Sequence, residues 1–229
     1  MMKRIGLAVL VLLIASQNCL AGGVALSSTR VIYDGSKKET SLTVQNRSDK
    51  EEYLIQSWVD DVNGSKQTPF IITPPLFKLD AKKNNVLRIV NIKETLPQDR
   101  ESVFWINVKA IPSESDENAD KNVLQIAVRT RLKLFYRPVG LKGNPVDAIK
   151  QLHFQQQSNQ IIVSNDSAFN LTFNKFSVNG KDIEKAGMVL AKNKLTINLP
   201  ANSGKVSEVK YNVINDFGTS GDILTQRVE

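Results

Sequence analysis

The sequence predicts an all-β protein built from two β-sandwich domains, each of roughly immunoglobulin size. Short segments in which apolar and polar residues alternate recur along the chain, and clusters of Gly, Asn, Asp and Pro separate them. Segments with the 3.6-residue period of a helix are nearly absent. With 229 residues, the chain is long enough for two domains of about 100 residues that each bury a core.

The first 21 residues have the pattern of a secretory signal peptide. Lys3 and Arg4 form a charged start, Leu7 to Ile14 form an apolar segment, and Ala21 is a small residue suited to cleavage. The apolar segment is too short to span a bilayer, which takes about 20 apolar residues, so we expect export without stable membrane insertion. The one cysteine, Cys19, lies in this leader, so we expect an exported protein without disulfides.

After the signal peptide, we expect the strands in two groups, one for each domain. Between the groups, residues 139–145 contain two glycines and a proline, which break the alternating pattern. We therefore expect a first domain at 22–138, a linker at 139–145 and a second domain at 146–229. The expected strands are Ser41–Gln45, Glu52–Val59, Val86–Ile92 and Val103–Ala110 in the first domain, then Gln160–Val163, Leu171–Val178, Lys194–Leu199 and Val206–Val213 in the second.

The last expected strand of the first domain, from Asn122 to Pro138, is unusually long. Its apolar positions share one parity: Leu124, Ile126, Val128, Leu132 and Leu134. Gln125, Arg129, Arg131 and Lys133 occupy the other parity. This alternation is typical of a half-buried strand, and an ordinary core strand explains it. A second interpretation stays open, in which the strand lies at a sheet edge and offers that edge to a partner.

Composition and motifs argue against catalysis and against metal or cofactor binding. The only histidine is His153, and with no cysteine after the leader the chain lacks the residues of a nitrogen–sulfur metal cluster. We find no Gly-x-Ser-x-Gly elbow and no Gly-rich phosphate loop. The net charge of +7 comes from basic residues scattered among acidic ones, so we expect no nucleic-acid partner. A surface that receives carboxylate-bearing protein partners is the simpler interpretation.

Several motifs resemble the periplasmic chaperones of the chaperone–usher pilus pathway. They are Thr29–Tyr33 (TRVIY), Thr73–Pro75 (TPP), Leu96–Ser102 (LPQDRES), Asn122–Pro138 with its LKLFYRP end, and Ile214–Gly218 (INDFG). The resemblance covers the whole chain after the leader. It implies two immunoglobulin-like domains in a bent, boomerang arrangement with an interdomain cleft, in the periplasm. The modest linker from Ser113 to Lys121 and the lack of a disulfide resemble the branch with a short loop before the last strand.

The resemblance also implies a function and a role for particular residues. The protein would bind pilus subunits by donor-strand complementation and deliver them to an outer-membrane usher. The implied residues are Arg30 and Lys133 as the anchor for the C-terminal carboxylate of a pilus subunit, Leu124, Ile126 and Val128 as donor-strand side chains, Arg88, Glu101 and Asp216 as an interdomain charged trio, and Thr73, Pro74 and Pro75 as an usher contact.

One alternative is a pilus structural subunit or adhesin of similar β-sandwich build. Subunits of this pathway usually carry a disulfide and a C-terminal β-zipper, and this chain lacks both. Self-association of the protein through its exposed strand also stays open.

Overall fold

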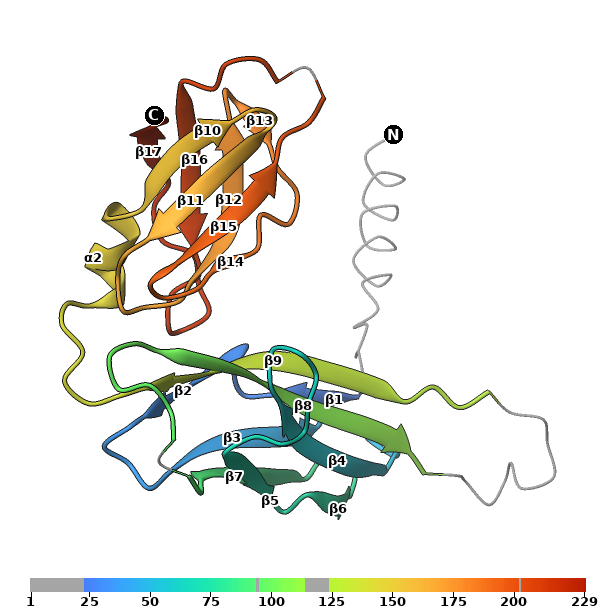
Figure 1. Cartoon of the computed structure of the whole chain (residues 1–229). Helices are drawn as coiled ribbons and strands as arrows, with labels where there is room; N and C mark the ends of the chain where they lie inside the picture. Colours follow the sequence, from blue (N-terminus) through green and yellow to red (C-terminus); the bar gives the residue numbers. More distant parts are fainter. Residues whose placement is uncertain (1–22, 94, 114–123, 202) are drawn as a thin grey trace, which may run out of the picture.

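The computed structural model describes residues 23–93, 95–113, 124–201 and 203–229. Within these residues the chain forms two β-sandwiches, joined by a short linker into a bent molecule (Figure 1). The prediction of an all-β, two-domain fold is therefore confirmed. The expected signal peptide lies outside the described residues.

The first domain packs a four-stranded sheet against a five-stranded sheet within the described residues. The four-stranded sheet has the order β1-β3-β7-β5, and the five-stranded sheet has the order β2-β9-β8-β4-β6. These strands are β1 (Val24–Leu26), β2 (Arg30–Asp34), β3 (Glu39–Asn46), β4 (Tyr53–Asp60), β5 (Phe70–Thr73), β6 (Leu76–Leu79), β7 (Asn84–Asn91), β8 (Ser102–Pro112) and β9 (Val128–Arg137).

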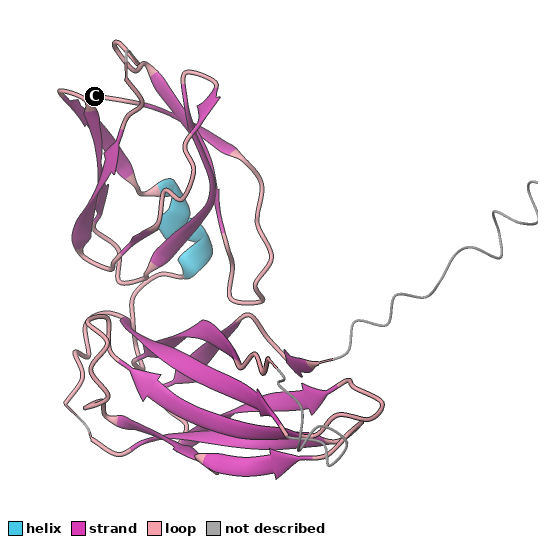
Figure 2. Ribbon diagram, turned by 90° about the vertical axis from the view of Figure 1, so that its right-hand side faces the viewer, coloured by secondary structure: helices cyan, strands magenta, loops and turns pink. Residues whose placement is uncertain are grey.

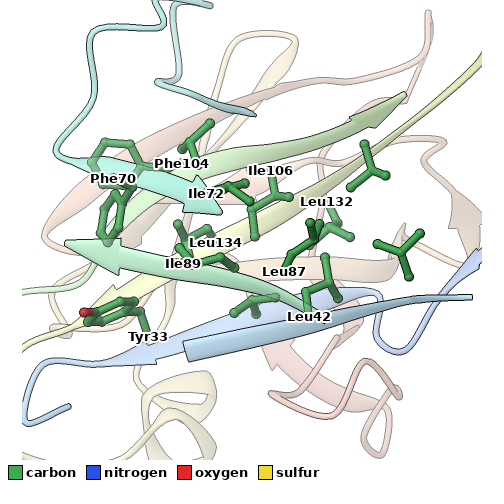
Figure 3. Packing of buried hydrophobic residues seen from close by; sticks show 14 of the residues in the cluster. Tyr33, Leu42, Phe70, Ile72, Leu87, Ile89, Phe104, Ile106, Leu132 and Leu134 are labelled. Atoms are coloured by element: carbon green, nitrogen blue, oxygen red, sulfur yellow. The ribbon is translucent and has the colours of Figure 1, made fainter. Parts of the chain in front are cut away.

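The core of the first domain lies between these two sheets. Leu42, Leu87 and Ile89 come from one sheet and Ile106 and Leu134 from the other, and all five are nearly inaccessible to solvent. Figure 3 shows these side chains pointing toward one another between the layers. On β9 the core takes the even-numbered residues, so the odd-numbered residues face away from it. That parity decides which side chains of β9 are free to build a site.

The second domain begins with a short helix and continues as a smaller sandwich. Its elements are α2 (Pro145–Lys150), β10 (His153–Gln157), β11 (Gln160–Asn165), β12 (Leu171–Val178), β13 (Lys181–Asp182), β14 (Met188–Val189), β15 (Asn193–Asn198), β16 (Glu208–Val213) and β17 (Leu224–Arg227). One sheet has the order β10-β11-β15, and the other runs β13-β12-β16-β17 with β14 also paired to β12. Its separate core includes Phe154, Phe176 and Tyr211.

Helix α2 lies at the end of the second domain that faces the first (Figure 2). Asn144 caps it, because the Asn144 side chain accepts a hydrogen bond from the Asp147 amide at 2.9 Å. Pro145 occupies the first helical turn, where its missing N–H costs nothing. No helix of the described residues is long and apolar enough to cross a membrane.

The regular part of the long strand is shorter than the sequence predicts. Strand β9 begins at Val128, and Leu124 to Ala127 extend beyond it without strand pairing. Its neighbour β8 ends at Pro112, two residues past Ala110, which pairs with Val128. Proline cannot donate to a ladder, so the pairing ends where that partner ends. Figure 1 shows the segment before β9 reaching past the sandwich.

Candidate functional site

Strands β2 and β9 pair in parallel and place two cations side by side. The register sets Arg30 opposite Lys133, and both residues lie on the face turned away from the core. Directly paired residues of neighbouring strands point to the same face of a sheet, so both side chains project toward the second domain. The structure therefore brings together the two residues predicted to anchor a carboxylate.

The second domain closes over these cations with hydrogen-bond acceptors. Arg30 Nη1 donates to the Ile214 carbonyl at 2.9 Å, and Lys133 Nζ donates to Thr172 Oγ1 at 3.0 Å. The Arg30 guanidinium also lies 5.5 Å from the ring centroid of Phe135. Residues from both domains thus surround each cation.

Neither cation forms an ion pair with a carboxylate within the part of the chain that the structure describes. No acidic oxygen of those residues lies within 4.0 Å of Arg30 or Lys133, and the buried Arg30 Nε has no hydrogen-bond partner there. Burial, and then the charge of Arg30, lower the pKa of Lys133 to about 8. Burial likewise lowers the pKa of Arg30. Two desolvated cations, one of which has an unpartnered N–H, are the kind of arrangement that can bind an anion.

Beside these cations, one edge of β9 is open. Strand β2 covers β9 only from Lys133 to Arg137, and no described strand pairs with Val128–Leu132 on that side. The side chains predicted to donate to a partner precede or begin this stretch. Leu124 is 87% exposed, Ile126 is 66% exposed and Val128 is 60% exposed. Apolar side chains exposed in a row beside an unpaired edge are typical of a strand that receives a partner.

The sandwich itself is open along this edge. A cavity of about 320 Å³ lies between β1 and the start of β9, and its lining includes Val24, Leu26, Ile126 and Val128. Its walls are mainly apolar side chains, so a partner that inserts apolar side chains here would remove both surfaces from water.

An interdomain charged trio exists, but its arginine is Arg137. Arg137 Nε donates to Glu101 Oε1 at 2.7 Å, and its two terminal nitrogens donate to Asp216 at 2.8 and 3.0 Å. Glu101 is almost fully buried, and its other oxygen accepts from the Asn170 amide of the second domain at 2.8 Å. The sequence pointed correctly to Glu101 and Asp216.

The prediction that Arg88 belongs to this trio is wrong. Arg88 lies on β7 in the other sheet of the first domain, where its side chain is exposed and its register partners are Ser41 and Thr73. Arg137 shares the parity of Lys133 on β9, and this parity faces the second domain. The position of Arg137 four residues after Lys133 was the signal that could have identified it.

Two of the sequence motifs converge on the same interdomain contact. In the INDFG motif, Ile214 accepts from Arg30 and Asp216 pairs with Arg137. Gly218 has a φ of +84°, and a Cβ there would collide with Thr29 of the first domain. In the LPQDRES motif, Asp99 pairs with Lys192 of the second domain at 2.7 Å. These motifs therefore position the domains around the cation pair.

The remaining predicted site lies elsewhere. Thr73, Pro74 and Pro75 join β5 to β6, and Ser57 of β4 holds the loop by donating to the carbonyls of Pro74 and Pro75 at 3.1 and 2.8 Å. His153 is exposed on β10. Among the described residues, no group of three or more His, Cys, Asp or Glu side chains is arranged to hold a metal ion.

Both domains match models of one protein family. Residues 23–142 match "Pili and flagellar-assembly chaperone, PapD N-terminal domain", and residues 147–223 match "Pili assembly chaperone PapD, C-terminal domain". Chaperone protein LpfB of Salmonella typhimurium is 71% identical over 227 residues, which cover 99% of this chain and 98% of LpfB. Chaperone protein FimC of Escherichia coli is 41% identical over 208 residues, which cover 90% of this chain and 85% of FimC.

Solved structures of similar fold come from the same class of protein. A structure of the Salmonella enterica SafA pilin in complex with the SafB chaperone matches with a TM-score of 0.81 and 32% identity, covering 90% of this chain and 96% of that one. The periplasmic chaperone SfaE matches with a TM-score of 0.75 and 38% identity, covering 89% and 98% of the two chains.

We expect Arg137→Ala to lower the free energy of unfolding by about 3 kcal/mol, because it leaves the buried Glu101 without its cation. Arg88→Ala is the matched control and should change stability by less than about 0.5 kcal/mol. Urea unfolding followed by the fluorescence of Trp58 and Trp105, both in the first domain, measures the two variants. Equal losses in both variants would contradict the assignment of Arg137.

The lowered pKa of Lys133 gives a second expectation, with a defined sign. Between about pH 8 and the ordinary lysine value of 10.5, the unfolded chain holds a proton that folded Lys133 has lost. Stability of the wild type relative to Lys133→Met should therefore rise with pH across this window. Urea unfolding of both proteins at about pH 7 and about pH 9.5 tests this, and a difference that stays constant would refute the shift.

Proposed function

This chain belongs to the PapD family of pilus-assembly chaperones, and from that premise we propose that it captures pilus subunits on the open edge of β9. It is a fimbrial chaperone, as its relatives LpfB and FimC are. The alternative of a pilus subunit or adhesin has no support, because both family models describe assembly chaperones. What remains to be proposed is how this chain holds its subunit.

The parallel pairing of β2 with β9 is the observation that carries the proposal. β2 starts at Arg30, opposite Lys133, and leaves the edge of β9 free before that point. A strand that fills the free edge in line with β2 and ends at Arg30 must run parallel to β9. Its C-terminal carboxylate then lies beside Arg30, whose Nε is unpartnered, and Lys133, whose ammonium has further N–H groups besides the one donated to Thr172. Each pilus subunit has one C-terminus, so this contact sets a single register.

The fixed register places the donor side chains of this chain against the subunit. A subunit that lacks one strand of its sandwich exposes an apolar groove, which would otherwise aggregate. Leu124, Ile126 and Val128 are exposed and share one parity, so they can enter such a groove together. At about 25 cal/mol per Å² of apolar area, three aliphatic side chains contribute several kcal/mol before ordering costs.

The charged trio orients the second domain for this task. Arg137 joins Glu101 of the first domain to Asp216 of the second, which keeps Thr172 and Ile214 over the cation pair. The role is one of orientation, because a buried ion pair contributes little net stability. Each proposed step is a binding step, in which no covalent bond is made or broken.

The signal peptide predicted at 1–21 and the likeness to the periplasmic chaperone SfaE support action in the periplasm. In that compartment the chain would capture pilus subunits as they are exported.

The open edge of β9 is also available to a second copy of the chain, so binding assays should be done at low protein concentration.

We propose a second contact, between the surface around the Thr73–Pro75 loop and an outer-membrane usher. Leu76 follows the loop and is 55% exposed, and the exposed Leu54 lies on the neighbouring strand β4. This apolar surface is on the opposite edge of the sheet from β2 and leaves the open edge of β9 clear.

We expect Leu76→Asp to weaken the binding of a chaperone–subunit complex to the purified periplasmic portion of an usher. Capture of pilus subunits by this variant should stay normal. Ile71→Asp, an exposed apolar position on the other sheet, is the control and should change neither. Unaltered usher binding by Leu76→Asp in a pull-down assay would reject this surface.

We expect Lys133→Met to weaken capture of a peptide from the C-terminus of a pilus subunit by at least about 30-fold, because one partner of a buried charge pair is lost. Arg30→Ala should have a similar effect. Fluorescence anisotropy with a labelled peptide measures this, and Lys194→Met, an exposed lysine of the second domain, serves as the control. A peptide with an amidated C-terminus should bind wild type as weakly as the free-acid peptide binds Lys133→Met. Equal binding of the free and amidated peptides would reject the carboxylate anchor.

A further inference from the structure

A row of cations runs along the outer face of the first domain beside the open edge. Lys109 of β8 lies directly opposite Arg129 of β9, and Arg131 follows on the same face. We name these three residues the cationic stripe. The Arg131 guanidinium stacks 4.2 Å from the ring centroid of Trp105, which holds it against the sheet.

The cationic stripe is not neutralised within the described residues. None of its three members has an acidic oxygen of that part of the chain within 4.0 Å, although exposed ion pairs form at other surface positions, such as Lys78 with Glu52. Like charges directly opposite one another in a sheet are unfavourable. The direct pairing of Lys109 with Arg129 therefore leaves a local positive potential that an acidic partner would relieve.

The position of the stripe determines which partner can reach it. Arg129 and Arg131 lie on the stretch of β9 that β2 leaves uncovered. Residues paired directly across two strands point to the same face, so a strand on the open edge would set alternate side chains beside Arg129 and Arg131. The donor side chains have the opposite parity, so a strand of regular pleat would carry them on its other face. The two sets of contacts are therefore independent.

We propose that the cationic stripe selects pilus subunits whose C-terminal strand carries Asp or Glu at two outward-facing positions. This inference rests on the proposed capture of a pilus strand parallel to β9. With the terminal carboxylate held at Lys133, one acid lies close to the C-terminus beside Arg131. The second lies two residues earlier, beside Arg129, with Lys109 behind it. The chain would thus recognise acidic residues at alternate positions of its partner strand, in addition to the apolar residues between them.

The expected effect is moderate and sensitive to salt. Exposed cross-strand ion pairs change affinity by roughly two- to fivefold each, so two pairs should give about tenfold. Screening shortens the reach of such charges to about 8 Å at physiological ionic strength, and the preference should shrink further at about 1 M salt. The terminal carboxylate contact lies between the domains and should be less affected by salt.

The test uses the purified protein and two peptides of equal length that share the same apolar residues, each made with a free and with an amidated C-terminus. One peptide carries Glu at the two outward positions, and the other carries Gln. We expect the wild type to prefer the Glu peptide by about tenfold at low salt, and Arg129→Gln/Arg131→Gln to bind both peptides equally. Arg47→Gln/Arg227→Gln, which removes the same charge from exposed sites of both domains, should keep the preference.

The possible results distinguish the selective role of the cationic stripe from the proposed strand capture on which it rests. If both peptides bind the wild type equally but need a free carboxylate, capture of pilus subunits stands and the cationic stripe has no selective role. If binding ignores the carboxylate, the capture geometry itself is wrong. A preference that survives in Arg129→Gln/Arg131→Gln, or that disappears in the control double variant, would also overturn the proposal, because a general charge effect would then explain it.

Discussion

The parallel pairing of β2 with β9 is the constraint on which the rest of the structure depends. Because β2 begins at Arg30, it covers only the second half of β9 and leaves the first half as an open edge. The same register sets two cations at the point where the open edge ends. In the proposed capture, this one pairing provides both the open edge for a partner strand and the binding site for its C-terminus. The apolar parity of β9 continues from the core of this protein into the exposed residues that we propose as its donor side chains.

This arrangement opposes the stability of the free protein. Three aliphatic side chains stay exposed in one row, and burial lowers the pKa of Lys133 to about 8. Both features are unfavourable in the free protein, and the proposed partner would relieve them by covering the apolar row and supplying a carboxylate. The trio of Arg137, Glu101 and Asp216 joins the two domains despite the unfavourable exposed apolar row and buried cations. In the proposed complex, the gain in free energy therefore comes from these groups, which are unsatisfied in the free protein and held in position by well-packed neighbours.

The sequence predicted the fold well where the periodic pattern was long enough. The expected strand Leu171–Val178 has the same bounds as β12, although a β-bulge between Phe173 and Lys175 interrupts its alternation. Strands β5, β6, β13 and β14 have two to four residues and carry too little pattern to detect. Parity predicts one face for Leu124, Ile126 and Val128, but it could not show that pairing with β8 stops at Val128. Arg88 and Arg137 both alternate outward. The parity that Arg137 shares with Lys133 was a signal for β9, and the tertiary packing shows that the outer face of β9, not that of β7, meets the second domain.

The direction of the captured strand is the central claim, and a paramagnetic label tests it most directly. The probe is a bound peptide with the C-terminal sequence of a pilus subunit and a spin label on its N-terminus. The label should broaden the amide signals near Leu124, while the peptide carboxylate shifts the Lys133 ammonium signal. A parallel strand that ends at Arg30 requires both effects together. Broadening centred on the residues after Lys133, near the second domain, would mean an antiparallel strand and would contradict the account.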